Sequence, residues 1–398
     1  MQTTDVVVVG GGIAGLACAA LLARGGRTVT VLERGPAVGG LARTATHGGF
    51  SFNRGAHALY RGGAAEAVLD RLGIALPGAA PGLRGVAYYE GARHRLPSSP
   101  WAMLTTSLLS MRGRWALGKL FGSVASLQAG DESAAEWARG RTPDAASRAF
   151  LEAMLRLSTY CGDLESVRAA DAVAALRQAS VHGVRYLDGG WQALVDALME
   201  ACARSGVTIH TRAPVAAVEA EGVTLRDGST LAAREVVVAA SPSASAEWID
   251  IPRLNTARVA CLDVALRKRP VGPGLAFDLN DPMYLSVHSD VATLGPGAMV
   301  HTIHYGAVHD ARERLEGLLD RTLPGWRDHV VHTQFLPRIT VTEGIVPPGS
   351  KGRPGVRAGG VWRVGDAVGA HGGLADAAFG SALEVAHAIL ATAKPRAA

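Results

Sequence analysis

The chain has 398 residues, of which 48% are hydrophobic and 19% charged, so the composition excludes an intrinsically disordered protein and predicts about two domains. The formal net charge is +5, and no dense run of lysine and arginine is interleaved with aromatic residues, so nucleic acid is not an expected partner. The four cysteines form no Cys-x-x-Cys pair, which argues against a zinc site and against a secreted disulfide framework. The sequence predicts no signal peptide and no long apolar span, and therefore a cytoplasmic location.

Residues 5–33 have the order strand, glycine turn, helix, strand. The apolar run VVVV predicts a buried strand of a parallel sheet, and IAGLACAALLAR predicts a helix that ends at a glycine pair. Gly10, Gly12 and Gly15 have the G-x-G-x-x-G spacing, which permits a tight turn, close approach to a diphosphate and close packing of the helix. Glu33 follows near the expected distance of ~20 residues, where an acidic residue binds a ribose hydroxyl. The segment predicts a bound dinucleotide.

A second glycine pair, Gly39 and Gly40, follows soon after and is itself followed by Arg43. The segment RGPAVGGLARTATHGGFSFNRGAHAL resembles the glycine-doublet region of the flavoprotein superfamily that includes phytoene desaturases, protoporphyrinogen oxidase and monoamine oxidases. In that superfamily the doublet passes along an extended FAD, and Arg43 matches a basic position of the same region. FSFNRGAHAL resembles a segment beside the isoalloxazine ring, with Asn53 where aspartate is usual. The resemblance implies FAD as the cofactor.

Two later blocks carry the same resemblance. Val215 matches a residue that contacts adenine, and VWRVGDAVGAHGGLADAAFGSALEVAHAIL resembles the closing flavin motif. In that motif Asp366 would hold the ribityl or phosphate region, and the N-terminus of the following helix would face the flavin pyrimidine and stabilise negative charge there. The residues predicted to contact FAD are Gly10, Gly12, Ile13, Ala14, Gly15, Glu33, Arg34, Gly39, Gly40, Leu41, Arg43, Gly55, Ala56, His57, Val215, Ala240, Gly365, Asp366, Gly373, Leu374 and Ala377.

The resemblance implies an α/β fold with two domains. A Rossmann-like FAD-binding domain is expected from the discontinuous segments 1–60, 188–245 and 355–398. A substrate-binding domain is expected from a helical insertion over 61–187 and from a mixed or antiparallel sheet over 246–354. Helical composition in the first insertion and extended runs such as AMVHTIHY in the second agree with this division.

Two histidines are candidates for acid–base chemistry. His57 lies in the segment expected near the flavin ring, and His371 lies in the loop after the closing strand, so either could be a base or a donor to a substrate carbonyl. The alternatives are domain packing for His57 and a solvated loop position for His371. Asp376 precedes a helical run, where a helix N-cap is the simplest role. His301 and His304 stand three apart on an expected strand and face opposite sides, so no metal site is expected.

The expected function is an FAD-dependent dehydrogenase or desaturase, similar to phytoene desaturases, acting on an apolar or specialised-metabolite substrate. The run ARVACLDVALRK lacks the central lysine, and the closing motif lacks the paired aromatic residues, that monoamine oxidases have. A redox-neutral flavin-dependent isomerase or cyclase, an amine or amino-acid oxidase that releases peroxide, and a non-catalytic FAD-binding protein remain alternatives. A second dinucleotide motif is not found, so a dedicated NAD(P)H domain is not expected.

The segment RHRLPSSPWAMLTTSLLSMRGRWALGKLF combines aromatic residues with basic ones. These are Trp101, Trp115 and Phe121 together with Arg112, Arg114 and Lys119. It could form a helix pair at a membrane interface that admits a lipophilic substrate. The favoured interpretation is that it forms the outer helices of a substrate domain, since basic amphipathic helices are common. The expected partners are therefore a small apolar molecule and, weakly, an anionic membrane surface.

Overall fold

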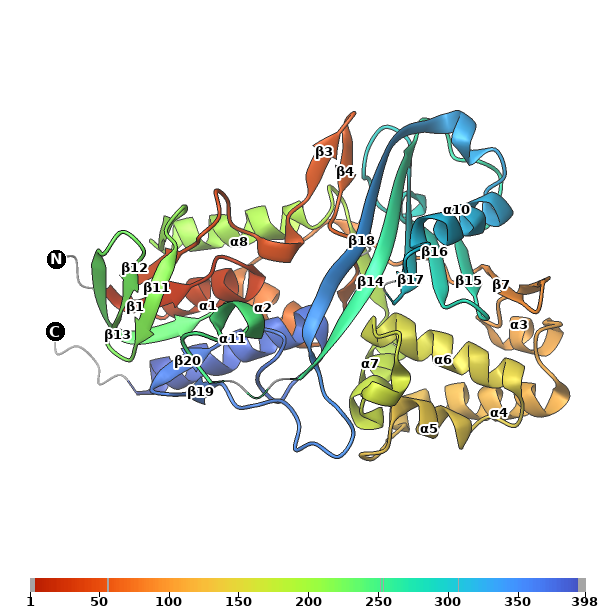
Figure 1. Cartoon of the computed structure of the whole chain (residues 1–398), viewed down its shortest axis with the longest axis horizontal. Coiled ribbons are helices and arrows are strands. Elements are labelled where there is room, and N and C mark those ends of the chain that lie inside the picture. Colours follow the sequence, from red (N-terminus) through yellow and green to blue (C-terminus); the bar gives the residue numbers. More distant parts are fainter. Residues whose placement is uncertain (1–3, 56, 251, 253, 307, 393–398) are drawn as a thin grey trace.

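The computed structural model describes residues 4–55, 57–250, 252, 254–306 and 308–392. The chain forms two halves, each built on a large sheet (Figure 1). The first sheet has eight strands in the order β10-β2-β1-β13-β12-β11, with β20 beside β13 and β19 beside β20. These strands are β1 (Thr4–Val9), β2 (Val29–Leu32), β10 (Thr208–His210), β11 (Val215–Glu219), β12 (Gly222–Leu225), β13 (Thr230–Val238), β19 (Arg357–Ala358) and β20 (Val361–Arg363).

The parallel part of this sheet joins short apolar runs from distant parts of the chain. Val9 at the end of β1 lies opposite Leu32 of β2 and Val238 of β13. Val238 in turn lies opposite Arg363, the last residue of β20. Because these strands are parallel, their carboxyl ends meet at one edge of the sheet, which is where such folds bind ligands.

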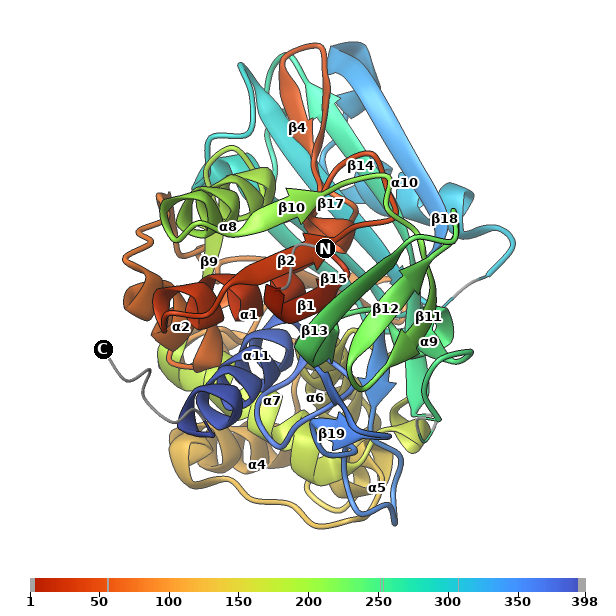
Figure 2. The same ribbon diagram turned by 90° about the vertical axis from the view of Figure 1, so that its left-hand side faces the viewer.

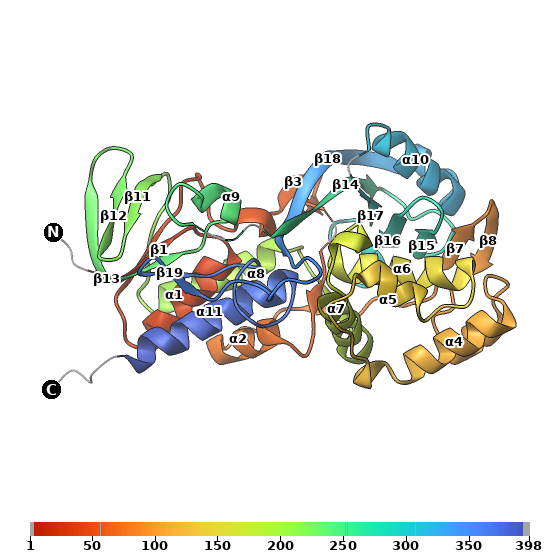
Figure 3. The same ribbon diagram turned by 60° about the horizontal axis from the view of Figure 1, so that its bottom comes forward.

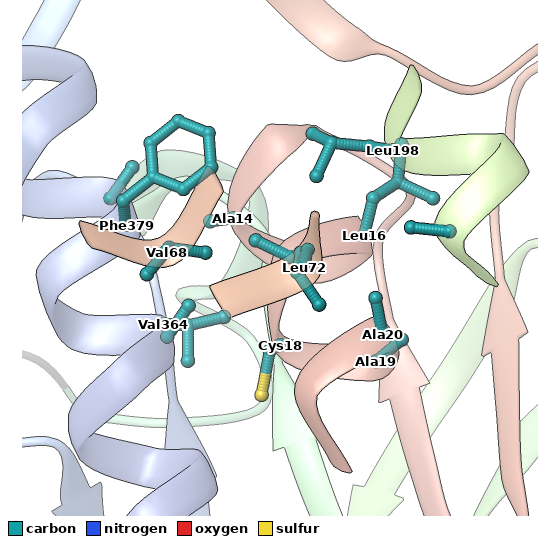
Figure 4. Packing of buried hydrophobic residues seen from close by; sticks show 14 of the residues in the cluster. Ala14, Leu16, Cys18, Ala19, Ala20, Val68, Leu72, Leu198, Val364 and Phe379 are labelled. Carbon is teal, nitrogen blue, oxygen red and sulfur yellow. The ribbon is translucent and has the colours of Figure 1, made fainter. Parts of the chain in front are cut away.

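Helices cover one face of the parallel strands. They are α1 (Ile13–Arg24), α8 (Gln192–Arg204) and α11 (Leu374–Ala391), with α2 (Ala64–Leu72) packed against α11. Figure 4 shows Phe379, Val68 and Leu198 packing around the alanines and Leu16 of α1, whose small side chains let three helices approach closely. Of the described helices, α11 alone has the length and apolar composition of a membrane span, but 56% of it is buried inside the protein, so it packs here as a core helix.

The second sheet has seven strands in the order β18-β14-β17-β16-β15-β7-β8. They are β7 (Val86–Tyr89), β8 (Ala92–Arg95), β14 (Asn255–Leu266), β15 (Leu275–Asp278), β16 (Met283–Val287), β17 (Ala298–Tyr305) and β18 (Val330–Ile345). α10 (Ala311–Thr322) packs on one face. The opposite face meets the helical layer of α5 (Ala134–Arg139), α6 (Ala145–Thr159) and α7 (Ala169–His182) (Figure 3). All but one of the strand pairs are antiparallel, the exception being β15 with β7.

The remaining helices and strands are β3 (Ala45–His47), β4 (Phe50–Phe52), β5 (Leu59–Tyr60), β6 (Gly78–Ala79), β9 (Val184–Leu187), α3 (Pro100–Thr105), α4 (Met111–Gly122) and α9 (Pro242–Ser245). Of these, α4 packs against α6 and α3 packs against α4, so both belong to the helical layer of the second half. The long strands β14 and β18 run along the junction between the halves in Figure 1, and they lie behind the first sheet in the view of Figure 2. The α/β fold expected from the sequence, with a Rossmann-like part and a mixed sheet, is confirmed. The sheet expected over 246–354 includes the sixteen-residue strand β18, in which polar and apolar residues alternate irregularly.

Candidate active site

A cavity of about 1420 Å³ lies where the two halves meet. One wall is the carboxyl edge of the parallel sheet, with Val9, Leu32 and Val238. The other wall comes from the seven-stranded sheet and includes Cys261 and Ile303. Small-molecule pockets usually measure roughly 300–1,000 Å³, so this cavity can hold an extended dinucleotide together with a substrate.

The first glycine turn forms one end of the cavity. Gly10 has a φ of +114°, and a Cβ there would lie 2.7 Å from the carbonyl oxygen of Ala239. A Cβ at Gly15 would overlap the carbonyl oxygen of Gly10, so α1 begins directly against the turn. Gly12 caps α1 and lines the cavity, and a Cβ there would meet open space. A glycine cap has no side chain to accept from the first N–H groups of α1, so these remain available to an anion.

Glu33 is fixed beside this turn. Its Oε2 accepts from the Gly11 N–H at 2.9 Å, and its Oε1 accepts from the Gly35 N–H at 2.7 Å. A carboxylate offers about four acceptor positions, so both oxygens can also accept from ligand hydroxyls. Glu33 lines the cavity, which fits its expected role at a ribose.

The glycine doublet lies against the first turn. Gly39 and Gly40 have φ values of +109° and +56°, and the Gly39 N–H donates to the Gly11 carbonyl oxygen at 2.7 Å. A Cβ at Gly40 would lie 3.4 Å from the Cα of Gly12. Two turns without side chains therefore lie next to each other at the cavity wall, and this bare groove fits the diphosphate of a dinucleotide.

The structure gathers most of the predicted cofactor residues around one cavity. Those that line it are Gly10, Gly12, Ile13, Ala14, Glu33, Arg34, Gly39, Gly40, Leu41, His57, Val215, Ala240, Gly365, Asp366 and Leu374. Those among the described residues that do not line it are Gly15, Arg43, Gly55, Gly373 and Ala377. Ala56 lies outside the described residues.

The residues away from the cavity wall have other contacts. Gly15 lies beneath the turn, and the side chain of Arg43 lies where a Cβ of Gly39 would point. Ala377 is fully buried in the first turn of α11, and Gly373 is the N-cap residue of that helix. The carbonyl oxygen of Gly55 binds a histidine ring.

His57 lies on the cavity wall, whereas His371 does not. The Nδ1 of His57 is 2.8 Å from the Gly55 carbonyl oxygen, so Nδ1 must carry the hydrogen and Nε2 keeps its lone pair. Its ring lies 4.7 Å from that of Trp191, and burial lowers its pKa, so the imidazole is neutral at neutral pH. His371 is exposed and lies outside the cavity lining.

Asp376 is not the N-cap of α11, as the sequence had suggested. The cap is Gly373, and Asp376 lies in the first turn of the helix. Its Oδ1 accepts from the Ala65 N–H of α2 at 2.8 Å, and burial raises its pKa. Asp376 therefore links α11 to α2, because its carboxylate caps the N-terminus of α2 and not that of its own helix.

A polar row crosses the second sheet beside the cavity. Cross-strand register places Ser286, His301, Asp263 and Gln334 in line over β16, β17, β14 and β18. The His301 Nδ1 donates to the Asp263 Oδ1 at 2.7 Å, and both side chains are fully buried. The Gln334 Nε2 donates to the Asn53 carbonyl oxygen at 2.7 Å. The polar row therefore fixes the backbone at Asn53, shortly before His57 on the cavity wall.

His304, in contrast, bonds through Nε2 to Asp281 at 2.9 Å. His301 and His304 thus have separate partners, and the described residues contain no cluster of metal-ligating side chains.

Acid is expected to destabilise the protein through a half-buried histidine, His57, and a buried histidine, His288. Burial lowers the pKa of His57 and lowers that of His288 well below its usual value. The unfolded chain binds protons at these positions below pH ~6.5 while the folded protein does not, so stability falls as pH drops through that range. His288 stacks on Tyr186 at 3.7 Å, and His288→Phe preserves the stack. We expect urea unfolding of this variant to show a shallower loss of stability below pH ~6.5, by up to ~1.4 kcal/mol per pH unit. Equal slopes in the two proteins would contradict this expectation.

The fold and the double glycine turn define a flavin-dependent oxidoreductase. A sequence profile for the family "flavin containing amine oxidoreductase" matches residues 13–262, more than half of the chain, and the protein belongs to this family. FAD is its cofactor, in agreement with the expectation from the sequence.

Solved structures share the fold at low sequence identity. An oxidoreductase from Methanosarcina mazei has a TM-score of 0.76 and 17% identity, over 97% of this chain and 100% of that one. Putrescine oxidase bound to putrescine has a TM-score of 0.74 and 19% identity, over 98% and 99% of the two chains. Cyclohexylamine oxidase from Brevibacterium oxydans has a TM-score of 0.71 and 18% identity, again over 98% and 99%.

Curated relatives match over short stretches. All-trans-retinol 13,14-reductase from Homo sapiens is 41% identical over 74 residues, which is 18% of this chain and 12% of that protein. An inactive all-trans-retinol 13,14-reductase from Danio rerio is 53% identical over 51 residues, 13% of this chain and 8% of that protein. The match thus spans about a tenth of the length of these relatives.

Proposed function

We propose that the protein is an FAD-dependent dehydrogenase or desaturase that removes a hydride from a C–H bond of an apolar substrate. The observation that supports this is the wall of the cavity opposite the glycine turns. Its described residues from β14 and β17 are Val259, Cys261 and Ile303, none of which is charged, and the carboxylate that β18 contributes, Glu343, accepts from Ser243. The side chains of this wall and its neighbours are Tyr60, Tyr160, Trp191, Val259, Cys261, Ile303, Leu336 and Ile339.

Different residues of the site would bind the cofactor, orient the substrate and accept a proton. Bound FAD supplies the two-electron acceptor, since the flavin N5 takes up a hydride. The N–H groups of α1 and the carboxylate of Glu33 would hold the diphosphate and a ribose. The apolar wall would orient the substrate and exclude water. Loss of a hydride and a proton from neighbouring carbon atoms forms a C=C bond, and the lone pair of the His57 Nε2 would accept the proton.

Anaerobic titration of the holoprotein tests the proposal. We would add cyclic, alkene and polyene compounds, with retinol among the probes because curated relatives are named for it, and record the flavin absorbance. Bleaching by one class, with a product two hydrogens lighter, would support a dehydrogenase. Bleaching by amines alone, with peroxide on admission of O2, would assign an amine oxidase instead. A product of unchanged mass, formed only after pre-reduction of the flavin, would assign an isomerase.

We also propose that α3 and α4 associate with an anionic membrane surface. Four large apolar side chains project from these helices, with Trp101 67%, Leu104 61%, Met111 74% and Trp115 75% exposed. Residues 91–130 contain no aspartate or glutamate but five arginine or lysine residues. Tryptophan with arginine and lysine is the combination that favours a lipid headgroup region.

Vesicle sedimentation measures this association. We expect binding to phosphatidylglycerol vesicles that weakens with salt, weaker binding to phosphatidylcholine, and at least ~10-fold weaker binding of a Trp101→Ser, Trp115→Ser double variant. Val271→Ser is the matched control, since Val271 is 93% exposed on another part of the surface. Equal binding of the double variant, or lipid-independent dimerisation that it abolishes, would contradict the proposal.

A further inference from the structure

Tyr160 brings an unpaired hydroxyl to the cavity. It is 8% exposed, lines the cavity and packs in the cluster that contains Val259, Cys261 and Ile303 of the apolar wall. Its hydroxyl makes no hydrogen bond within the described part of the chain and is open to solvent, whereas the hydroxyl of Tyr305 is unpaired and closed. The apolar wall therefore carries a hydrogen-bond donor that a ligand can reach.

The backbone holds this side chain in an uncommon conformation. Tyr160 is the C-cap residue of α6 and has a φ of +57° and a ψ of 13°, the left-handed region where glycine is the usual residue at a helix end. Two residues further on, a Cβ at Gly162 would lie 2.7 Å from the carbonyl oxygen of Tyr305, so the loop is packed closely against the end of β17. A bulky residue in this region is strained, and such strained residues cluster at ligand sites.

The other described tyrosine that lines the cavity already has a partner. The Tyr60 hydroxyl donates to the Ser158 carbonyl oxygen at 3.3 Å. Burial raises the pKa of Tyr160 well above its usual value, so its phenol stays protonated and remains a donor. A ligand that uses this donor must bring an acceptor, such as an oxygen atom, to a wall that is mostly apolar.

A proton acceptor lies in the same region of the cavity. A Cβ at Gly55 would lie 3.2 Å from the Cys261 Sγ, and the Gly55 carbonyl oxygen accepts from the His57 Nδ1. Cys261 is also close enough to Tyr160 to raise its pKa further, so the imidazole and the phenol line the cavity on either side of Cys261. A base and a donor to a carbonyl oxygen are the two groups that removal of a proton beside a carbonyl requires.

We propose that the substrate is an apolar ketone whose carbonyl oxygen accepts from the Tyr160 hydroxyl, and that the C–C bond next to this carbonyl is dehydrogenated. The carbon beside the carbonyl loses a proton to the His57 Nε2. The next carbon loses its hydrogen as hydride to oxidised FAD, so a conjugated C=C bond forms and two electrons leave the substrate. The phenol keeps its proton and stabilises the charge that gathers on the carbonyl oxygen. This inference rests on the dehydrogenase proposed above and adds a substrate class to it.

Paired probes test the assignment. We would titrate the holoprotein under nitrogen with decalone and decalin, and with androstanone and androstane, and follow the perturbation of the flavin absorbance. We expect the ketone of at least one pair to bind about 5-fold or more tightly than its hydrocarbon, and Tyr160→Phe to remove this difference. Tyr305→Phe is the matched control, because its hydroxyl is closed to the cavity. Both variants should melt at or above the wild-type temperature, since neither hydroxyl has a partner in the described part of the protein.

The rate of flavin reduction separates binding from chemistry. Loss of one donor to a developing oxyanion costs about 100-fold in rate, so Tyr160→Phe should slow reduction by the ketone about 100-fold while weakening its binding only about 5-fold. Equal binding of ketone and hydrocarbon in both pairs, or an unchanged preference for the ketone in Tyr160→Phe, would overturn the assignment. Bleaching by hydrocarbons alone would support the dehydrogenase and overturn the ketone. Ketone binding that depends on Tyr160 but never bleaches the flavin would support the ketone site and contradict the dehydrogenase.

Discussion

Gly12→Glu is expected to abolish FAD binding while the apoprotein stays folded. Gly12 has a φ of −73° and a ψ of 176°, a conformation open to any residue, and a Cβ there meets nothing within 4 Å. The new carboxylate would lie in the cavity at the N-terminus of α1, where it would compete with the diphosphate for the same N–H groups and repel it. We expect a loss of affinity of ~100-fold or more, measured as flavin absorbance retained after gel filtration and as the Kd for FAD.

Gly15→Val provides the contrast within the same motif. Its Cβ would overlap the Gly10 carbonyl oxygen, so the turn or α1 must move. Overpacking of this kind typically costs about 1–3 kcal/mol, and we expect the apoprotein itself to lose stability. The prediction for Gly12 is wrong if Gly12→Glu retains FAD, or if its apoprotein melts as low as that of Gly15→Val. Thermal unfolding of the two apoproteins decides between these results.

The cofactor end of the site was predictable because its geometry is encoded locally. A glycine turn between a strand and a helix has few conformations, so the spacing of Gly10, Gly12 and Gly15 indicates both the turn and its ligand. Glu33 follows at the end of the next strand for the same reason. The structure places Gly10, Gly12 and Glu33 on the cavity wall, and Gly15 directly beneath it.

The substrate end depends on contacts between distant residues. Asp263 and His301 meet only because β14 and β17 pair in one register, and a shift by one residue would place the two on opposite faces. Arg363 was recognised as part of a strand, but its burial depends on neighbours that only the folded chain brings together. Asp376 shows the same limit, since its partner on α2 is more than 300 residues away.

His301→Leu is expected to lower the free energy of unfolding by about 3–5 kcal/mol at neutral pH, because it leaves the fully buried Asp263 without its histidine. The remaining contact of this carboxylate is with the Gln334 Nε2 at 3.3 Å, which carries no charge. Urea unfolding of the variant and of the wild type at neutral pH measures this loss.

Two further variants separate the charge from the loss of packing. His304→Leu, on the same strand, leaves Asp281 with an ion pair to Arg314 at 2.9 Å and a side chain 25% exposed, so we expect a cost of about 1 kcal/mol or less from its electrostatics. Asp263→Leu combined with His301→Leu removes both buried partners and should recover most of the lost stability. If His301→Leu costs no more than His304→Leu, or if the double variant is as unstable as the single one, then packing and not a compensated charge accounts for the stability of this row.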